Sequence, residues 1–142
     1  MQQFRSQDIM LGPAWANVRA LYKAAGFSGT ELNGPIIGVV DAFNDICPGH
    51  VNLRRVARRV MDGILAAGGT PVEFGTIGAC DGIAMGQDGM KYILPGREAV
   101  AQDVEVMSEA HRLDGLVLIG SCDKIEPGLM LGALRVSLPA VF

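Results

Sequence analysis

The feature that most constrains the fold is an alternation of short apolar runs with longer stretches of helical periodicity. The apolar runs, rich in β-branched residues, lie at 36–40, 71–78, 115–120 and 138–142. The helical patterns between them lie at 50–67, 97–112 and 127–136. Strands that alternate with helices favour a parallel sheet with right-handed crossovers. We therefore expect an α/β fold with an open, mostly parallel sheet flanked by helices.

A further helix is predicted before this alternation begins, over residues 14–26. Gly34 and Pro35 then interrupt the chain, so we expect an N-terminal helical segment over 1–34 and an α/β domain over 35–142. The clearest helix, 50–67, carries a continuous apolar stripe made of Leu53, Val56, Ala57, Val60, Met61, Ile64 and Leu65. Residues 79–95 contain several glycines and are predicted to be a long loop.

Charge and hydropathy exclude several classes of protein. The net charge is −3 and no basic run occurs, which argues against a nucleic-acid-binding protein. No apolar stretch approaches the roughly 20 residues of a membrane span. The N-terminus shows no secretory signal, so we expect a cytoplasmic protein. The three cysteines are widely spaced and odd in number, which favours thiols or metal ligands over disulfides.

Each of three predicted loops that follow strands contains a cysteine and at least one aspartate. These loops span 41–50, 79–95 and 121–127. Their cysteines are Cys47, Cys80 and Cys122, and their aspartates are Asp41, Asp45, Asp81, Asp88 and Asp123. Because loops that follow parallel strands emerge at the carboxyl edge of the sheet, where such sheets bind ligands, we expect these side chains to share one edge.

The chemistry of these loops leaves several interpretations open. Taken singly, Cys122 could be a small buried apolar residue, Asp123 a helix cap and Lys124 a surface lysine. His50 has no second histidine at helical spacing, so hydrogen bonding is preferred to zinc ligation for it. Thiolates suit iron–sulfur clusters and carboxylates suit Mg²⁺, which suggests two metal centres or one cluster beside a hard cation. The glycines of 80–90 match no phosphate-binding pattern.

Three segments of the chain carry a specific family resemblance. They read "PIIGVVDAFNDICPGHVNLR", "GGTPVEFGTIGACDGIAMGQDGMKYILPGREAVAQDVE" and "DGLVLIGSCDKIEPGLMLGALRVSLPAVF". They resemble the N-terminal region of the dihydroxy-acid and sugar-acid dehydratase family, from about residue 13 to the end. The combination of D-G-I-A-M-G with C-D-K-x-x-P-G is the most specific part of this resemblance.

The resemblance implies a role for five residues. Cys122 would bind an iron–sulfur cluster, of either the 2Fe-2S or the 4Fe-4S type, with Cys80 as a further cluster ligand. Asp81, Asp123 and a carbamylated Lys124 would bind Mg²⁺. One branch of the family has a cluster cysteine directly after the proline of the first loop. Here Gly49 stands at that place and Cys47 comes two positions earlier, so Cys47 is left out of the expected ligand set.

The resemblance also implies a hydro-lyase that converts a 2,3-dihydroxy acid of the 2,3-dihydroxyisovalerate type to a 2-oxo acid. This reaction belongs to branched-chain amino-acid biosynthesis, towards isoleucine and valine. Mg²⁺ would hold the substrate, and an open iron would act as Lewis acid for the departing hydroxyl. A sugar-acid dehydratase acting on an aldonate or phosphogluconate is an alternative. A non-catalytic fragment or metal-binding module is an alternative of another class.

Members of this family are several times longer than 142 residues. A further cluster cysteine, another metal carboxylate and the serine taken as the catalytic base lie, in the family, beyond the segment that corresponds to this chain. We therefore expect a truncated N-terminal part of a longer dehydratase, inactive in isolation. The full-length form is expected to be a homodimer that acts on a small-molecule dihydroxy acid.

Overall fold

The computed structural model describes residues 4–142, which form a helical segment followed by alternating strands and helices. The N-terminal segment contains α1 (Gln7–Met10), η1 (Pro13–Trp15), α2 (Ala16–Ala24) and η2 (Glu31–Asn33). The alternating part contains β1 (Ile36–Asp41), α3 (Leu53–Ala66), β2 (Thr70–Gly75), α4 (Asp81–Ala84), η3 (Asp88–Tyr92), α5 (Ile93–Ala110), β3 (Gly115–Ile119), α6 (Ile125–Val136) and β4 (Ala140–Val141).

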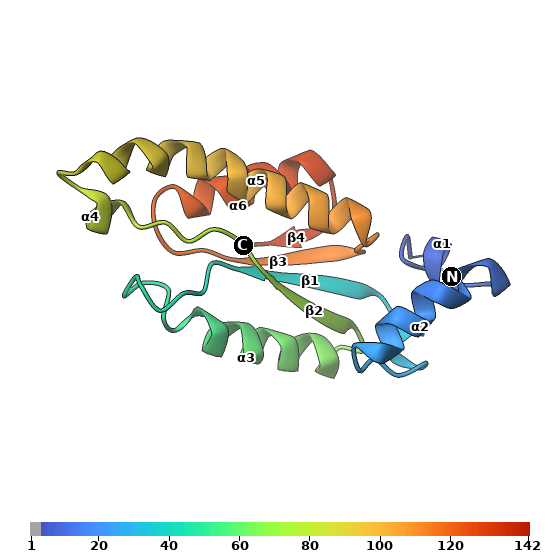
Figure 1. Ribbon diagram of the computed structural model, residues 1–142. Helices are drawn as coiled ribbons and strands as arrows, with labels where there is room; N and C mark the ends of the chain where they lie inside the picture. The colour runs from blue at the N-terminus through green and yellow to red at the C-terminus, as the bar shows by residue number, and fades with distance from the viewer. Residues whose placement is uncertain (1–3) are drawn as a thin grey trace.

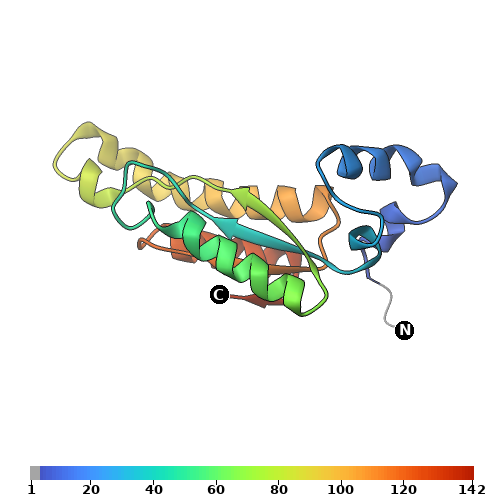
Figure 2. The ribbon, with the colours of Figure 1, turned by 90° about the horizontal axis from the view of Figure 1, so that it is seen from below.

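The described strands form one parallel sheet in the order β2-β1-β3-β4. The expected α/β class and the parallel sheet are therefore confirmed. α3 covers one face of the sheet, and α5 and α6 cover the other (Figure 1). The N-terminal helices lie at one end of the sheet, whereas the loops that follow β1 and β2 lie at the opposite end (Figures 1 and 2).

The central strand β1 is covered on both faces, which explains why it is apolar from Ile36 to Val40. Val39 and Val40 are completely buried. On the helical side, α6 approaches α5 closely because Gly128 and Gly132 face it. A Cβ atom at Gly132 would lie 2.6 Å from the Cβ of Val104, so no larger residue fits without displacing the helices.

Residues 79–95 differ from the long loop that the sequence predicted. They contain α4 and η3, and α5 begins at Ile93 rather than at Arg97. Pro95 is the third residue of α5, where its missing N–H costs nothing because the first turn has no internal acceptor for it. Pro127 has the same position in α6, so that helix also begins two residues earlier than predicted.

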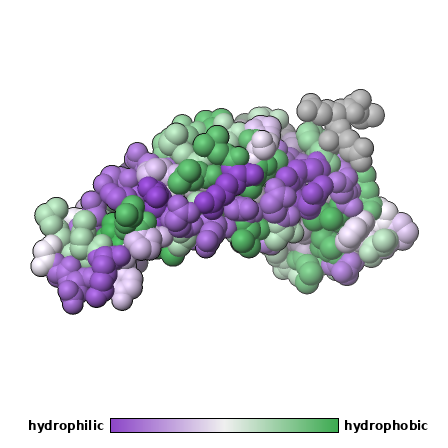
Figure 3. Space-filling model, turned by 90° about the horizontal axis from the view of Figure 1, so that it is seen from above, coloured by the Kyte–Doolittle hydropathy of each residue, from purple (hydrophilic) through white to green (hydrophobic). Residues whose placement is uncertain are grey.

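The predicted apolar stripe of α3 is only partly covered. Leu53 and Ala57 are buried, whereas Val56 and Leu65 are 43% and 50% exposed. The helix packs on β1 and β2, and β2 is an edge strand, so the outer side of the stripe extends past the sheet. Apolar side chains are also exposed on the opposite side of the molecule, where Figure 3 shows a hydrophilic band beside hydrophobic patches over the α5–α6 layer.

The N-terminal segment contributes to the same core as the sheet. Met10 and Leu32 are 2% exposed and belong to a buried cluster with Ile36 and Leu116. Asp114 joins the two parts, because its carboxylate accepts hydrogen bonds from the backbone N–H groups of Ser6 and Ile36. The domain division at residue 34 stays a prediction. Within residues 4–142, no helix combines the length and apolarity needed to cross a membrane.

Candidate metal centre

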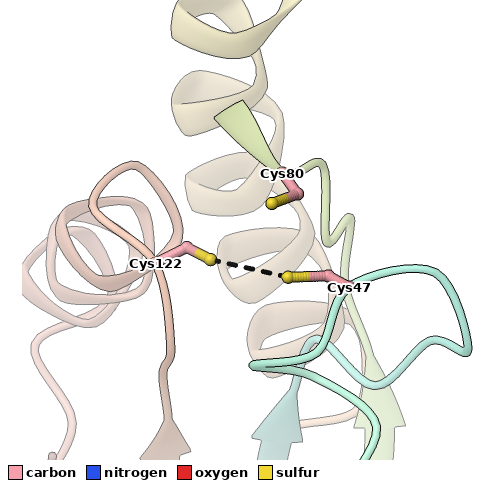
Figure 4. Close-up of side chains that lie close together, drawn as sticks. All are labelled: Cys47, Cys80 and Cys122. Atoms are coloured by element: carbon pink, nitrogen blue, oxygen red, sulfur yellow. Dashed lines mark hydrogen bonds between the residues drawn. The ribbon is translucent and has the colours of Figure 1, made fainter. Parts of the chain in front are cut away.

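The three cysteines meet at the carboxyl edge of the sheet. Cys47 lies in the loop after β1, Cys80 follows β2, and Cys122 follows β3. Their sulfur atoms all lie within 4.8 Å of one another, and the Sγ atoms of Cys47 and Cys122 are 3.9 Å apart (Figure 4). All three are free thiols, so this group offers three soft sulfur ligands to one metal centre.

Cys122 is held in an unusual backbone conformation. Its φ angle is +88°, in the left-handed region that residues with a Cβ rarely adopt. Such a conformation costs energy and persists only where surrounding contacts enforce it, most often at functional sites. The strained turn directs the Cys122 side chain towards Cys47, as Figure 4 shows.

The environment shifts the pKa values of two of these thiols in opposite directions. Burial raises the pKa of Cys122 to about 11, and hydrogen bonding and charge repulsion from Cys47 add to the effect. Burial also acts to raise the pKa of Cys47, but hydrogen bonds with the Cys80 thiol and the backbone of Gly49 outweigh it and lower the pKa. Cys47 therefore forms a thiolate more readily than Cys122, whose proton must leave when a metal binds.

The carboxylates and the amine that the resemblance implied for Mg²⁺ lie in the same loops as Cys80 and Cys122. Asp81 and Asp123 directly follow Cys80 and Cys122 in the chain. Lys124 Nζ lies 2.5 Å from Asp123 Oδ2, and this hydrogen bond is the main reason why the pKa of Asp123 is lowered. A hydrogen bond with the Asp81 side chain lowers that pKa further. The structure thus brings Asp81, Asp123 and Lys124 together.

His50 is completely buried and makes hydrogen bonds through both ring nitrogens. Its Nε2 lies 2.9 Å from the Ser121 carbonyl oxygen, which can only accept, so Nε2 carries the proton. Nδ1 then accepts from Asn44 Nδ2 at 2.9 Å. This arrangement agrees with the hydrogen-bonding role preferred for His50 from the sequence.

Cys47 is the one member of the sulfur group that the expected ligand set left out. Its side chain is 3% exposed and faces the other two cysteines. A Cβ atom at Gly49 would lie 3.8 Å from Cys47 Sγ, so the two positions face the same space. The feature of the sequence that pointed to Cys47 was the occurrence of one cysteine in each loop that follows a strand.

Asp41, the first aspartate of the loop that contains Cys47, accepts a hydrogen bond from the N–H of Phe43 at the end of β1.

Comparison with known proteins identifies the family. Residues 34–142 match the model of the dihydroxy-acid/6-phosphogluconate dehydratase N-terminal region. The chain belongs to this dehydratase family. Curated proteins named dihydroxy-acid dehydratase are similar to it over almost its whole length.

Three of these similar dehydratases illustrate the match. The protein from Ignicoccus hospitalis is 53% identical over 137 residues, which cover 96% of this chain and 25% of the relative. The protein from Pyrococcus abyssi is 51% identical over 138 residues, covering 97% and 25% respectively. The protein from Methanococcus vannielii is 53% identical over 136 residues, covering 96% and 25%. The chain therefore spans about a quarter of the length of these dehydratases.

Proposed function

We propose that this chain is the N-terminal part of a hydro-lyase that converts a 2,3-dihydroxy acid of the 2,3-dihydroxyisovalerate type to a 2-oxo acid. The names of the similar dehydratases support this substrate class, and with it a place in branched-chain amino-acid biosynthesis. The observation that carries the proposal is the convergence of three free thiols beside Asp81 and Asp123. Such a pairing of soft and hard donors fits a cluster next to a hard cation.

Cys47, Cys80 and Cys122 would hold the iron–sulfur cluster. The three thiols are close enough for one centre, and burial of Cys47 keeps water from one side of it. The bound cluster would supply a Lewis acid for the departing hydroxyl group. This ligand set adds Cys47 to the two cysteines inferred from the sequence.

Asp81, Asp123 and Lys124 would hold Mg²⁺. As a cationic amine, Lys124 pairs with Asp123 and would repel a metal ion. Reaction of its neutral amine with carbon dioxide forms a carbamate and releases a proton, which replaces the cation by an anionic oxygen donor. The contact between Lys124 and Asp123 supports this role, because a carbamate on that amine would lie next to the Asp123 carboxylate.

The test compares the 142-residue chain with a polypeptide of the relatives' length that begins with these residues. After anaerobic reconstitution with iron and sulfide, we expect cluster absorbance in the longer protein and its loss in Cys122→Ser. The longer protein should dehydrate 2,3-dihydroxyisovalerate faster than gluconate or 6-phosphogluconate. The isolated chain should show little turnover. Unchanged absorbance in Cys122→Ser would contradict the ligand assignment.

A sugar-acid dehydratase is the second candidate, because the matching family model covers 6-phosphogluconate dehydratases as well. Preference for 6-phosphogluconate in the same assay would favour it. Metal binding by the longer protein without turnover of any of these acids would favour a non-catalytic protein. The homodimeric state and the cytoplasmic location remain predictions from the sequence.

A further inference from the structure

A small hydrogen-bond network joins the three loops that carry the cysteines. Its side chains are Asn44 and His50, which lie on either side of Cys47 in the loop after β1. We propose that His50, together with Asn44, is a positioning residue that holds the three thiols in one ligand group. This inference rests on the proposed metal centre and assigns a role to residues that contribute no ligand to it.

His50 connects the first loop to the third. Its Nε2–H donates to the carbonyl of Ser121, the residue directly before Cys122. Because Cys122 adopts a φ of +88°, the peptide before it must be held against relaxation to an ordinary conformation. The bond from the imidazole supplies such a restraint, and because the ring is completely buried, bulk solvent cannot reach it to replace that bond.

Asn44 connects the first loop to the second. Its Nδ2 donates to the carbonyl of Gly78, two residues before Cys80, at 3.0 Å. Its Oδ1 accepts from the backbone N–H of Cys47, also at 3.0 Å. A Cβ at Gly78 would lie 2.3 Å from Asn44 Nδ2, so only glycine allows this approach.

The network therefore reaches the backbone within two residues of every cysteine. Asn44 also orients His50, because its Nδ2 donates to the imidazole Nδ1 and so leaves the proton on Nε2. The three loops follow different strands, and the other contacts described between them are those of the sulfur atoms and the one between Asp81 and Asp123. Loss of either side chain should let the sulfurs separate while the sheet below stays folded.

The test titrates the metal-free 142-residue chain with Co²⁺, whose thiolate charge-transfer absorbance scales with the number of bound sulfurs. Co²⁺ suits this geometry, because thiolates in a tetrahedral site with bonds of about 2.3 Å lie about 3.8 Å apart. We expect a three-thiolate spectrum for the unaltered chain. His50→Phe should weaken Co²⁺ binding by about tenfold to a hundredfold and lower the absorbance per metal ion.

Two further variants keep the test decisive if His50→Phe does not fold. His50→Gln retains a donor that can reach the Ser121 carbonyl and should restore part of the affinity. Asn44→Asp keeps the Oδ1 acceptor but removes the donors to Gly78 and His50, so it should weaken Co²⁺ binding as His50→Phe does. Rescue by the glutamine is a result that a merely space-filling role for His50 would not produce.

The control is Thr70→Val, which removes another buried hydrogen bond, from Thr70 Oγ1 to the Glu31 carbonyl, at the amino end of β2. It should lower the free energy of unfolding but leave the Co²⁺ spectrum and affinity unchanged. Equal losses of Co²⁺ affinity in Thr70→Val and the His50 variants would overturn the positioning role, as would unchanged affinity in the His50 and Asn44 variants. If the unaltered chain itself gives no thiolate absorbance with Co²⁺, that result contradicts the proposed metal centre and, with it, the positioning role of His50.

Discussion

Cys47 and Cys122 place their sulfur atoms 3.9 Å apart although 75 positions separate them in the chain. The contact exists because β1 and β3 are parallel neighbours, so the loops that follow them leave the same edge of the sheet. Since neither thiol is engaged in a disulfide, the pair is chemically available in the metal-free protein.

We predict that oxidation of the metal-free chain by diamide joins Cys47 to Cys122. Their sulfur atoms are 3.9 Å apart, so once diamide forms an adduct with either thiol, the other sulfur loses its proton and displaces the adduct. Two thiols are oxidised to one disulfide while diamide takes up two electrons and two protons. Peptide mapping by mass spectrometry identifies the linkage, and Cys80→Ala should leave it unchanged. A product dominated by linkages to Cys80 would contradict this prediction.

Metal affinity should rise with pH in the neutral range. The pKa of Cys122 is raised to about 11, so in the metal-free chain this thiol keeps its proton until strongly alkaline pH, and metal binding must displace it. Each proton released makes the apparent affinity about tenfold tighter per pH unit below that pKa. Co²⁺ titrations at pH 7 and pH 8 test this dependence. Cys122→Ala should remove one proton from those released on Co²⁺ binding, so the logarithm of the affinity should rise less steeply with pH. An unchanged pH dependence would show that Cys122 releases no proton.

Parts of this architecture could be predicted from the sequence because they follow from local patterns. The β-branched run of β1 and the alternation of strands and helices indicated a parallel sheet, whose geometry placed the cysteine loops at one edge. The short helices within 79–95 could not be predicted in the same way. Their glycines and Pro95 are typical of loops, and the helical first turn tolerates that proline only because of its position.

The arrangement of the sulfurs depends on contacts that no local pattern encodes. The positive φ of Cys122 occurs at a residue type that normally avoids it, so tertiary contacts must enforce it. The inclusion of Cys47 depends on the path of the loop after β1. That path is determined by Asn44 and His50, which bond to Gly78 and Ser121 in distant parts of the chain.

Replacement of Cys122 should reveal the strain at this position. Glycine adopts a φ of +88° without the Cβ penalty, whereas alanine retains it, so Cys122→Gly should be about 1 kcal/mol more stable than Cys122→Ala. Urea unfolding of the two metal-free variants measures the difference. At Cys80, where φ is −101°, the order should reverse and alanine should be the more stable. An Ala variant at 122 as stable as the Gly variant would show that the site is not strained.

Position 49 should accept the ligand role of position 47. A Cβ at Gly49 lies 3.8 Å from Cys47 Sγ, which places a side chain there against the same sulfur group. We expect Cys47→Ala to lose one thiolate from the Co²⁺ spectrum and the double variant Cys47→Ala/Gly49→Cys to regain it. The new Cβ would lie 2.6 Å from Ser121 Oγ, so recovery should improve when Ser121→Ala removes that hydroxyl. Gly49→Ser in the Cys47→Ala background is the matched control, because it adds a side chain of similar size without a thiol. Recovery with serine, or none with cysteine even after removal of the hydroxyl, would mean that the two positions are not equivalent.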